Sequence, residues 1–321
     1  MSHIQFENQS FSLAKEDVLT VLLNAGLEIP HNCRSGNCQS CLMKATEGTP
    51  PDTAQQGLKE TLKAQSYFLA CQCYPKEPLI IERPAANESR YESVLISKQW
   101  LSHNVIQLKL QRPSGFHFYA GQFVTLWKDE QLGRSYSIAN LADSDLLEFH
   151  IRIIPDGRFS NWIAHEASER QSVQLQGPAG DCFYIDDNLD RDLLLVGTGT
   201  GLAPLQGILH SALKAGHRGQ IDLFHGAIEP TGLYNSKQLS EIEAQHEQVS
   251  YHPCVLKQDA QTTAYLEGNI SELVLQNTSN LASKKAYLCG DPELVKQLKI
   301  KLFLAGMNSK EIYLDAFEAS T

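Results

Sequence analysis

The sequence predicts three successive domains: an α+β domain at residues 1–84, an antiparallel β-barrel at 91–188, and an α/β domain with a parallel sheet at 189–321. The first segment combines short strand-like runs, one helix and a cysteine-rich loop. The second is a series of short β-rich runs separated by turns, and in the third buried strands alternate with helices. A chain of 321 residues has room for two or three domains.

The composition is that of an ordinary globular protein, with 42% hydrophobic and 20% charged residues. The net charge of −10 disfavours a nucleic-acid partner, because proteins of that class present a basic face. The first 18 residues contain no basic segment followed by an apolar run, so we expect no secretory signal. We therefore expect a cytoplasmic protein, with no membrane partner, whose eight cysteines bind metal or remain thiols.

One uncharged stretch, residues 193–213, has the length of a membrane span. It contains four glycines and Pro204, which predict a strand, a glycine loop and the start of a helix instead.

The first domain is expected to contain a small sheet and one short helix. Its predicted elements are strands at residues 3–6, 10–13, 67–73 and 79–82 and a helix at 17–24 closed by Gly26. Residues 83–89 are polar, lack periodicity and contain Pro84, which is typical of a linker.

Four cysteines in this domain have a diagnostic spacing. Cys33, Cys38 and Cys41 form a C-x4-C-x2-C pattern, and Cys71 follows after 29 intervening residues. This is the plant-type 2Fe–2S spacing, in which one loop wraps the cluster and a distant residue supplies the last soft thiolate. Gly36 suits the tight turn that such a loop needs. A zinc site would normally add a second C-x2-C pair, and a Rieske centre would need two histidines, where only His31 is nearby.

Cys73 leaves one alternative open. In an extended strand, residues 71 and 73 point to the same face, so alternation does not separate Cys71 from Cys73. Residues 3–83 resemble the plant-type ferredoxins, whose fourth ligand lies in a Leu-x-Cys-Gln context, here residues 69–72. The resemblance implies a β-grasp fold with Cys71 as the fourth ligand.

The predicted barrel contains the string Arg134-Ser135-Tyr136-Ser137. A flavin nucleotide needs a cation at its pyrophosphate, an aromatic surface against its rings and a hydrogen-bonding group near N5. In a strand, Arg134 and Tyr136 would share one face and Ser137 would point away from Tyr136. Such a string is also frequent by chance in β-strands.

Two turns follow in the barrel segment. Gly157 precedes a helix that we expect Ser160 to cap, so that its N–H groups face a phosphate. Residues 177–180, Gly-Pro-Ala-Gly, predict a further turn.

In the third domain an apolar strand at 193–196 runs into a glycine loop and a helix start. Such a loop brings backbone close to a phosphate, and the helix dipole favours the anion. The loop is not a G-x-G-x-x-G fingerprint, because Leu202 occupies the third glycine position, and it lacks the P-loop lysine. A structural glycine turn is the alternative. Cys289-Gly290-Asp291-Pro292 is a second motif that follows a strand.

This ordered set of motifs, from about residue 92 to the C-terminus, resembles the ferredoxin–NADP reductase-like superfamily. The resemblance implies contacts of Arg134 with the FAD pyrophosphate, Tyr136 with the isoalloxazine and Ser137 with the region of N5, with Gly157 and Ser160 at phosphate. It implies a nicotinamide site bordered by Gly199, Thr200, Gly201, Pro204, Cys289 and Gly290. Phe317 stands where this family places a terminal aromatic residue against the flavin, although ordinary core packing is the alternative. Cys182 and Cys254 match no motif and are expected to be structural thiols.

The domain order resembles the reductase components of bacterial multicomponent oxygenases, and also the reductases of deoxysugar dehydration. It implies that electrons pass from NADH through FAD and the 2Fe–2S cluster to a redox partner protein, an oxygenase component or its ferredoxin. A deoxysugar dehydrase is the alternative acceptor. A ferredoxin-like binding module fused to a degenerate reductase is disfavoured, because the motifs are intact.

The nucleotide preference generates a testable prediction. Ile228 follows the second strand of the third domain, where many relatives carry arginine, and Glu229 would repel a 2′-phosphate. We expect kcat/KM for NADH to exceed that for NADPH in steady-state reduction of an artificial acceptor. A preference for NADPH would contradict this interpretation of Ile228.

Overall fold

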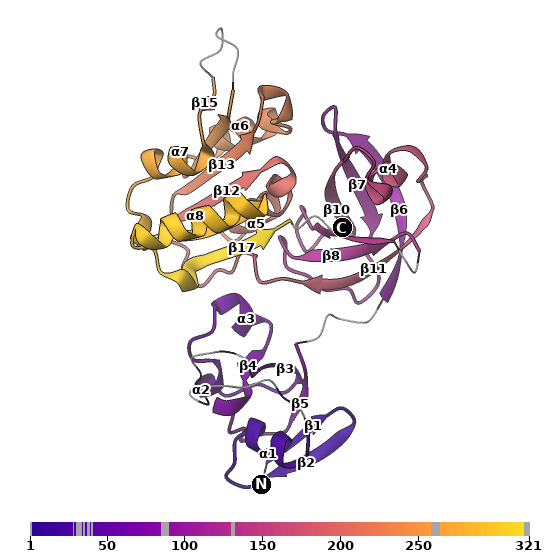
Figure 1. Ribbon diagram of the computed structural model, residues 1–321, viewed down its shortest axis with the longest axis vertical. Helices are drawn as coiled ribbons and strands as arrows, with labels where there is room; N and C mark the ends of the chain where they lie inside the picture. Colours follow the sequence, from indigo (N-terminus) through magenta and orange to yellow (C-terminus); the bar gives the residue numbers. More distant parts are fainter. Residues whose placement is uncertain are drawn as a thin grey trace. The chain divides into compact units, whose positions relative to one another are not determined.

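The computed structural model describes residues 2–27, 29, 34, 36, 39, 41–84, 90–129, 132–257 and 264–317. The chain divides into two compact units, Met1–Ala86 and Asn87–Thr321 (Figure 1). Each unit has hydrophobic clusters of its own. Within the described part of the chain, no helix combines the length and apolar character needed to cross a membrane.

The first unit is built on a five-stranded mixed sheet. Its strands are β1 Ser2–Phe6, β2 Gln9–Leu13, β3 Leu42–Glu47, β4 Tyr67–Leu69 and β5 Leu79–Glu82. They lie in the order β2-β1-β5-β3-β4, with β1 and β5 parallel and the other pairs antiparallel. This arrangement, with a helix packed on the sheet, confirms the predicted β-grasp fold.

The helix of this unit, α1 Val18–Asn24, begins where Asp17 caps it. The Asp17 carboxylate accepts a hydrogen bond from the backbone N–H of Thr20 at 2.9 Å. The short helices α2 Asp52–Gln55 and α3 Glu60–Ala64 follow later in the unit. The strand predicted at residues 67–73 was wrong in its second half, because β4 ends at Leu69 and residues Ala70–Gln72 form a 3-10 turn, η1.

The second unit begins with an antiparallel barrel, as predicted. Its strands are β6 Arg90–Trp100, β7 Val105–Gln111, β8 Phe123–Trp127, β9 Gly133–Ser137, β10 Leu146–Arg152 and β11 Ser172–Ala179, in the order β10-β7-β6-β11-β8-β9. A bridge between Ile138 and Phe149 joins the two edge strands, and Ala139 N–H donates to Glu148 C=O at 2.8 Å. These contacts close the sheet on itself. The turn expected at residues 177–180 was wrong, because β11 continues to Ala179 through a register shift.

The second part of this unit is an α/β layer with a parallel sheet. Its strands are β12 Leu193–Thr198, β13 Ile221–Ala227, β14 Val249–Val255, β15 Leu266–Glu267, β16 Lys285–Gly290 and β17 Ile312–Ala316. They lie in the order β15-β14-β13-β12-β16-β17, and every pair is parallel. The chain moves outward from β12 and then returns to β16 on its other side. Ligands of such sheets bind at the carboxyl ends of the two strands where the order reverses.

Helices cover both faces of the parallel sheet (Figure 1). They are α5 Leu202–Lys214, α6 Ser236–Gln245, α7 Ile270–Asn277 and α8 Pro292–Leu304, with 3-10 turns η2 Gly199–Gly201, η3 Pro230–Gly232, η4 Leu281–Ser283 and η5 Ser309–Glu311. Leucines of α5 and α6 pack on one face of the sheet, and apolar side chains of α7 and α8 pack on the other. Residues 193–213 therefore form the strand, glycine turn and helix that the sequence predicted.

Helix α5 also packs against the barrel, because Gly207 carries no side chain. A Cβ at Gly207 would lie 3.1 Å from both the Ala120 Cβ and the Ile138 carbonyl oxygen. The middle of α5 is thereby held beside the segment that follows β9.

Candidate functional site

The cysteine loop is described only in part. Cys33 and Cys38 lie outside the described residues, whereas Cys41 precedes β3 and Cys71 lies in η1. The N–H of Ala70 donates to the Cys41 carbonyl at 3.0 Å, so Cys41 and Cys71 flank the same end of the β3–β4 pair. Neither forms a disulfide. Two thiols at one end of a strand pair fit the donor set of a 2Fe–2S cluster.

Gln72 ties η1 to the cysteine loop. Its Nε2 donates to the Arg34 carbonyl at 3.1 Å and lies 3.6 Å from Cys71 Sγ. Gly36 has a φ of +81°, and a Cβ there would lie 3.3 Å from Cγ of Gln72, the residue after Cys71. Glycine therefore meets both requirements of this turn, a left-handed backbone and a close approach to η1.

Cys73 lies in different surroundings. Its side chain is fully buried, and its carbonyl accepts a hydrogen bond from Val18 N–H at the start of α1. Burial, followed by the nearby Asp17 charge, raises the pKa of Cys73 to about 12. Cys73 is therefore a protonated, buried thiol in the metal-free chain.

The expected flavin string lies on β9, at the edge where the barrel closes. The ring of Tyr136 packs against Phe159 with 5.6 Å between centroids. Burial raises the pKa of Tyr136, against the opposing charge of Arg134, so the phenol stays protonated. Ser137 is buried and points away from this face, in agreement with strand alternation.

Ser137 makes a contact that the sequence did not suggest. Its hydroxyl donates a 2.6 Å hydrogen bond to Oδ2 of Asp315, which lies on β17 in the parallel sheet. Burial raises the pKa of Asp315 to about 6, the bond from Ser137 opposes that shift, and the charge of Asp181 adds to it. The strand with the flavin string and the edge of the parallel sheet therefore meet at a carboxyl group that titrates near neutral pH.

The helix expected after Gly157 is α4 Arg158–His165, and its predicted cap was wrong. Gly157 occupies the N-cap position, and Ser160 lies inside the first turn. The Ser160 hydroxyl donates to the Gly157 carbonyl at 3.3 Å and accepts from Ile154 N–H at 3.2 Å. A Cβ at Gly157 would lie 2.7 Å from Ser160 Oγ, so the loop requires glycine here. The first-turn N–H groups of α4, rather than the hydroxyl, are the donors suited to a phosphate.

The glycine loop is packed tightly on one side and open on the other. A Cβ at Gly201 would lie 2.4 Å from the Cys289 carbonyl oxygen, so β12 and β16 end in close contact there. Gly199, with a φ of +53°, has one neighbour within 4 Å, Nη1 of Arg152 at 4.0 Å. Thr200 lies between these glycines, and Pro204 lies in the first turn of α5, where no backbone N–H is needed. A loop with two glycines at a strand switch point fits the approach of a dinucleotide.

Cys289 lies at the end of β16 and is fully buried. Its Sγ is 3.7 Å from Cys182 Sγ, and burial raises its pKa well above the ordinary value. The next residue, Gly290, has a φ of +111°, and a Cβ there would lie 2.8 Å from the Thr198 carbonyl oxygen. Cys289 is therefore a neutral thiol packed behind the glycine loop.

Phe317 is held beside this motif by a backbone hydrogen bond. Its N–H donates to the Gly290 carbonyl at 2.8 Å, which extends the pairing of β16 and β17. In that pairing Cys289 is opposite Asp315. The structure thus brings Ser137, Cys289 and Phe317 to one corner with the glycine loop.

Sequence reasoning missed three residues near this corner. Asp315 stands two positions before Phe317 on the same strand, and that alternation was an available signal. Arg152 ends β10, is exposed and forms no ion pair among the described contacts. The backbone N–H of Lys257 donates to the carbonyl of Ile228, whose side chain is 62% exposed, so a lysine residue adjoins the position used to predict the nucleotide preference.

Comparisons with known proteins identify three domain families along the chain. Family models match residues 3–76 as a 2Fe-2S iron-sulfur cluster binding domain, 92–184 as an oxidoreductase FAD-binding domain, and 195–300 as an oxidoreductase NAD-binding domain. The fold and its sites therefore define an oxidoreductase whose cofactors are a 2Fe–2S cluster, FAD and NAD.

Curated relatives match nearly the whole chain. The ferredoxin–NAD(P)+ reductase component of the naphthalene 1,2-dioxygenase system of Pseudomonas putida is 31% identical, covering 95% of this chain and 94% of the relative. Protein RfbI of Salmonella typhimurium is 28% identical, covering 99% and 95%. The chain belongs to the family of iron–sulfur flavoprotein reductases that includes the ferredoxin–NAD(P)+ reductase components of oxygenase systems.

Solved structures share the fold over the whole length. The Amycolatopsis cytochrome P450 reductase GcoB is 24% identical, with a TM-score of 0.70 and all of both chains covered. The ferredoxin reductase in carbazole 1,9a-dioxygenase is 24% identical, with a TM-score of 0.64, covering 99% of this chain and 98% of that one.

The raised pKa of Asp315 predicts a pH-dependent effect on stability. The folded protein keeps a proton on Asp315 up to about pH 6, whereas the unfolded chain releases it near about pH 4. The stabilisation is therefore complete below about pH 4 and is lost as the pH rises through about 6. Asparagine does not ionise, so Asp315→Asn should gain unfolding free energy relative to wild type between pH 4 and 7, on the order of 2 kcal/mol.

Denaturant unfolding of wild type and Asp315→Asn at pH 4 and at pH 7 measures this gain. The difference in unfolding free energy between the two proteins at each pH cancels the contribution of the other titrating groups, which both proteins share. A difference that does not change with pH would contradict the assignment.

Proposed function

We propose that this chain passes electrons from NADH through FAD and a 2Fe–2S cluster to a partner protein, an oxygenase component or the ferredoxin that serves it. One observation carries the proposal: the hydrogen bond from Ser137 to Asp315 brings the strand of the flavin string to the nucleotide corner. The relatives named as reductase components of dioxygenase systems support the choice of acceptor.

The residues present fit the three cofactors, and we propose their roles as follows. Arg134 and the first turn of α4, with Gly157 and Ser160, hold the flavin phosphates. Tyr136, Ser137 and Phe317 contact the flavin ring. The nucleotide is held by Gly199, Thr200, Gly201, Pro204 and Gly290. Arg152, which the sequence motifs did not include, also holds it, because its exposed guanidinium is suited to a pyrophosphate. When bound, FAD supplies the conversion between the two electrons that NADH gives and the single electrons that the cluster accepts.

Two titratable groups of the chain lie at this corner. Oδ2 of Asp315 accepts the hydrogen bond from the Ser137 hydroxyl, and burial raises the pKa of this carboxyl group to about 6, so Asp315 holds a proton below about that pH. Cys289 remains a neutral thiol because burial raises its pKa, so its role beside the nicotinamide is packing rather than nucleophilic attack.

We propose Cys33, Cys38, Cys41 and Cys71 as the cluster ligands. The preference for Cys71 over Cys73 is supported by Gln72, whose Nε2 is bonded to the cysteine loop at Arg34 and lies 3.6 Å from Cys71 Sγ.

Three further assignments belong to this proposal. The domain boundaries are 1–84, 91–188 and 189–321, in agreement with the extents of the family matches. The location is cytoplasmic, which suits a thiol-ligated cluster. NADH is preferred over NADPH, although Lys257 lies close to Ile228.

A non-oxygenase acceptor, such as a deoxysugar dehydrase, is the second candidate. One relative that matches over 99% of this chain, protein RfbI, is not named as an oxygenase component. Electron transfer tested against purified candidate acceptors separates the two.

The purified protein should contain one flavin and two irons per chain, and anaerobic NADH should bleach its visible absorbance. Iron analysis, flavin extraction and the absorption spectrum measure these quantities. A colourless protein without iron would refute the proposal.

Cys71→Ser should lose the cluster and electron transfer to protein acceptors while keeping NADH oxidation with ferricyanide as the artificial acceptor. Its matched control is Cys73→Ser, which should keep both irons because that thiol faces the core. Iron content and the electron paramagnetic resonance signal of the reduced protein report the result. Cluster loss in Cys73→Ser alone would reverse the ligand assignment.

A further inference from the structure

A hydrogen bond between two buried side chains joins the barrel to the parallel sheet, separately from the Ser137–Asp315 contact. His150 lies on β10, and Tyr234 follows η3 after β13. His150 Nδ1 is 3.0 Å from the Tyr234 hydroxyl, and the two rings meet edge to face at 5.3 Å. Each residue is 3% exposed, so the contact is shielded from water.

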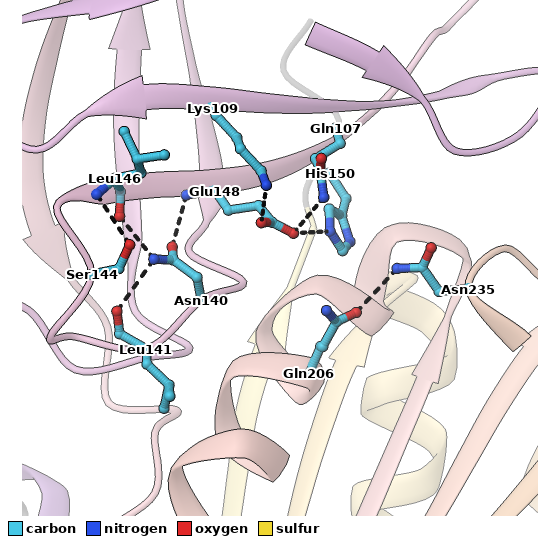
Figure 2. A network of polar contacts seen from close by, with 10 residues as sticks. All are labelled: Gln107, Lys109, Asn140, Leu141, Ser144, Leu146, Glu148, His150, Gln206 and Asn235. Carbon is cyan, nitrogen blue, oxygen red and sulfur yellow. Dashed lines mark hydrogen bonds and ion pairs between the residues drawn. The ribbon is translucent and has the colours of Figure 1, made fainter. Parts of the chain in front are cut away.

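Glu148 fixes the barrel side of this pair (Figure 2). Its Oε1 accepts from Gln107 Nε2 at 2.8 Å and lies 3.1 Å from His150 Nε2, while Lys109 is 3.5 Å from Oε2. A carboxylate only accepts, so we assign the tautomer in which His150 Nε2 donates to Glu148 and Nδ1 accepts from the Tyr234 hydroxyl. Burial, followed by the Glu148 charge, raises the pKa of Tyr234 well above its ordinary value, so the phenol remains a donor.

Two sets of contacts connect Tyr234 and its neighbour Asn235 to the glycine loop. The Tyr234 ring contacts His225 of β13 edge to face at 5.5 Å, and His225 pairs in register with Gly197, just before η2. Burial lowers the pKa of His225 to about 4, so this ring is uncharged near neutral pH. Asn235 follows Tyr234 in the sequence, and its Nδ2 donates to Gln206 Oε1 at 3.2 Å (Figure 2). Gln206 lies on α5, the helix that begins directly after the glycine loop.

His150, on the barrel side of the pair, is also connected to β9, the strand with the flavin string. Strand β10 bonds to the continuation of β9 through the Ala139–Glu148 hydrogen bond and the Ile138–Phe149 bridge. A shift at His150 would therefore move the strand that carries Ser137.

We propose that His150 and Tyr234 are positioning residues for electron transfer from the nucleotide to the flavin: their hydrogen bond fixes the glycine loop, residues 199–201, relative to β9. This inference rests on the proposed function, because it assumes that the loop holds the nucleotide and that β9 holds the flavin.

The test uses full-length, cofactor-loaded Tyr234→Phe, which removes the hydroxyl and keeps the ring. In anaerobic stopped-flow experiments, the limiting rate of flavin reduction should fall about tenfold, because small displacements of reacting groups are costly. The apparent Kd for NADH should stay within about twofold, since no nucleotide contact is removed. Hydrogen exchange of amides 197–203, measured without nucleotide, should become faster. If Tyr234→Phe does not fold, His150→Gln carries the same test.

The chain offers a matched control in a second tyrosine–histidine pair. The Tyr184 hydroxyl is 3.1 Å from His217 Nδ1, with an edge-to-face distance of 5.7 Å, and His217 lies before β13 rather than after it. Tyr184→Phe removes the same kind of buried hydrogen bond at the opposite end of that strand. It should lower the melting temperature to a similar extent without changing flavin reduction or exchange at 197–203.

A limiting rate of flavin reduction equal to that of wild type in both Tyr234→Phe and His150→Gln would overturn the inference. An equally large decrease of that rate in Tyr184→Phe would also overturn it. Wild-type protein whose flavin NADH does not reduce would instead overturn the proposed function. The two failures are therefore distinguishable.

Discussion

The contact between the carboxyl ends of β12 and β16 is the constraint on which the rest of the site depends. The Cys289 carbonyl occupies space that a side chain at residue 201 would need, and the Thr198 carbonyl does the same at residue 290. Glycine at both positions lets two central strands of the sheet end side by side with an open loop above them. Strand β17, which pairs with β16, then places Asp315 opposite Cys289, and the N–H of Phe317 is bonded to the Gly290 carbonyl.

The barrel and the sheet are separate folding patterns that must act as one frame, and contacts of different kinds join them. Gly207 allows close backbone packing, the Ser137–Asp315 bond joins two strand ends, and the His150–Tyr234 pair lies deeper in the interior. Packing alone leaves sliding motions, whereas buried directional bonds select one arrangement. A reaction between two bound cofactors needs that single arrangement, because its rate depends on the position of the reacting groups.

The sequence was sufficient for those features that are encoded locally. Spacing and strand periodicity predicted the fold class and the glycine loop, and the resemblance to the reductase superfamily implied that Ser137, Cys289 and Phe317 border the same cofactors. Local reasoning was wrong about the helix cap at Ser160, which lies within the first turn of its helix. It missed Asp315 and the His150–Tyr234 pair, whose partners are 178 and 84 residues apart in sequence. Only the tertiary structure brings such groups together, and no motif records them.

The environment of the sulfur atoms has a consequence for the durability of the protein. Oxidants attack thiolates that they can reach, and the products beyond sulfenic acid are mostly irreversible. Cys289 and Cys182, the sulfurs behind the nucleotide loop, are 0% and 2% exposed, and Cys289 is held protonated. These two sulfur atoms are thus kept in their least vulnerable form, so that burial itself protects them from oxidation.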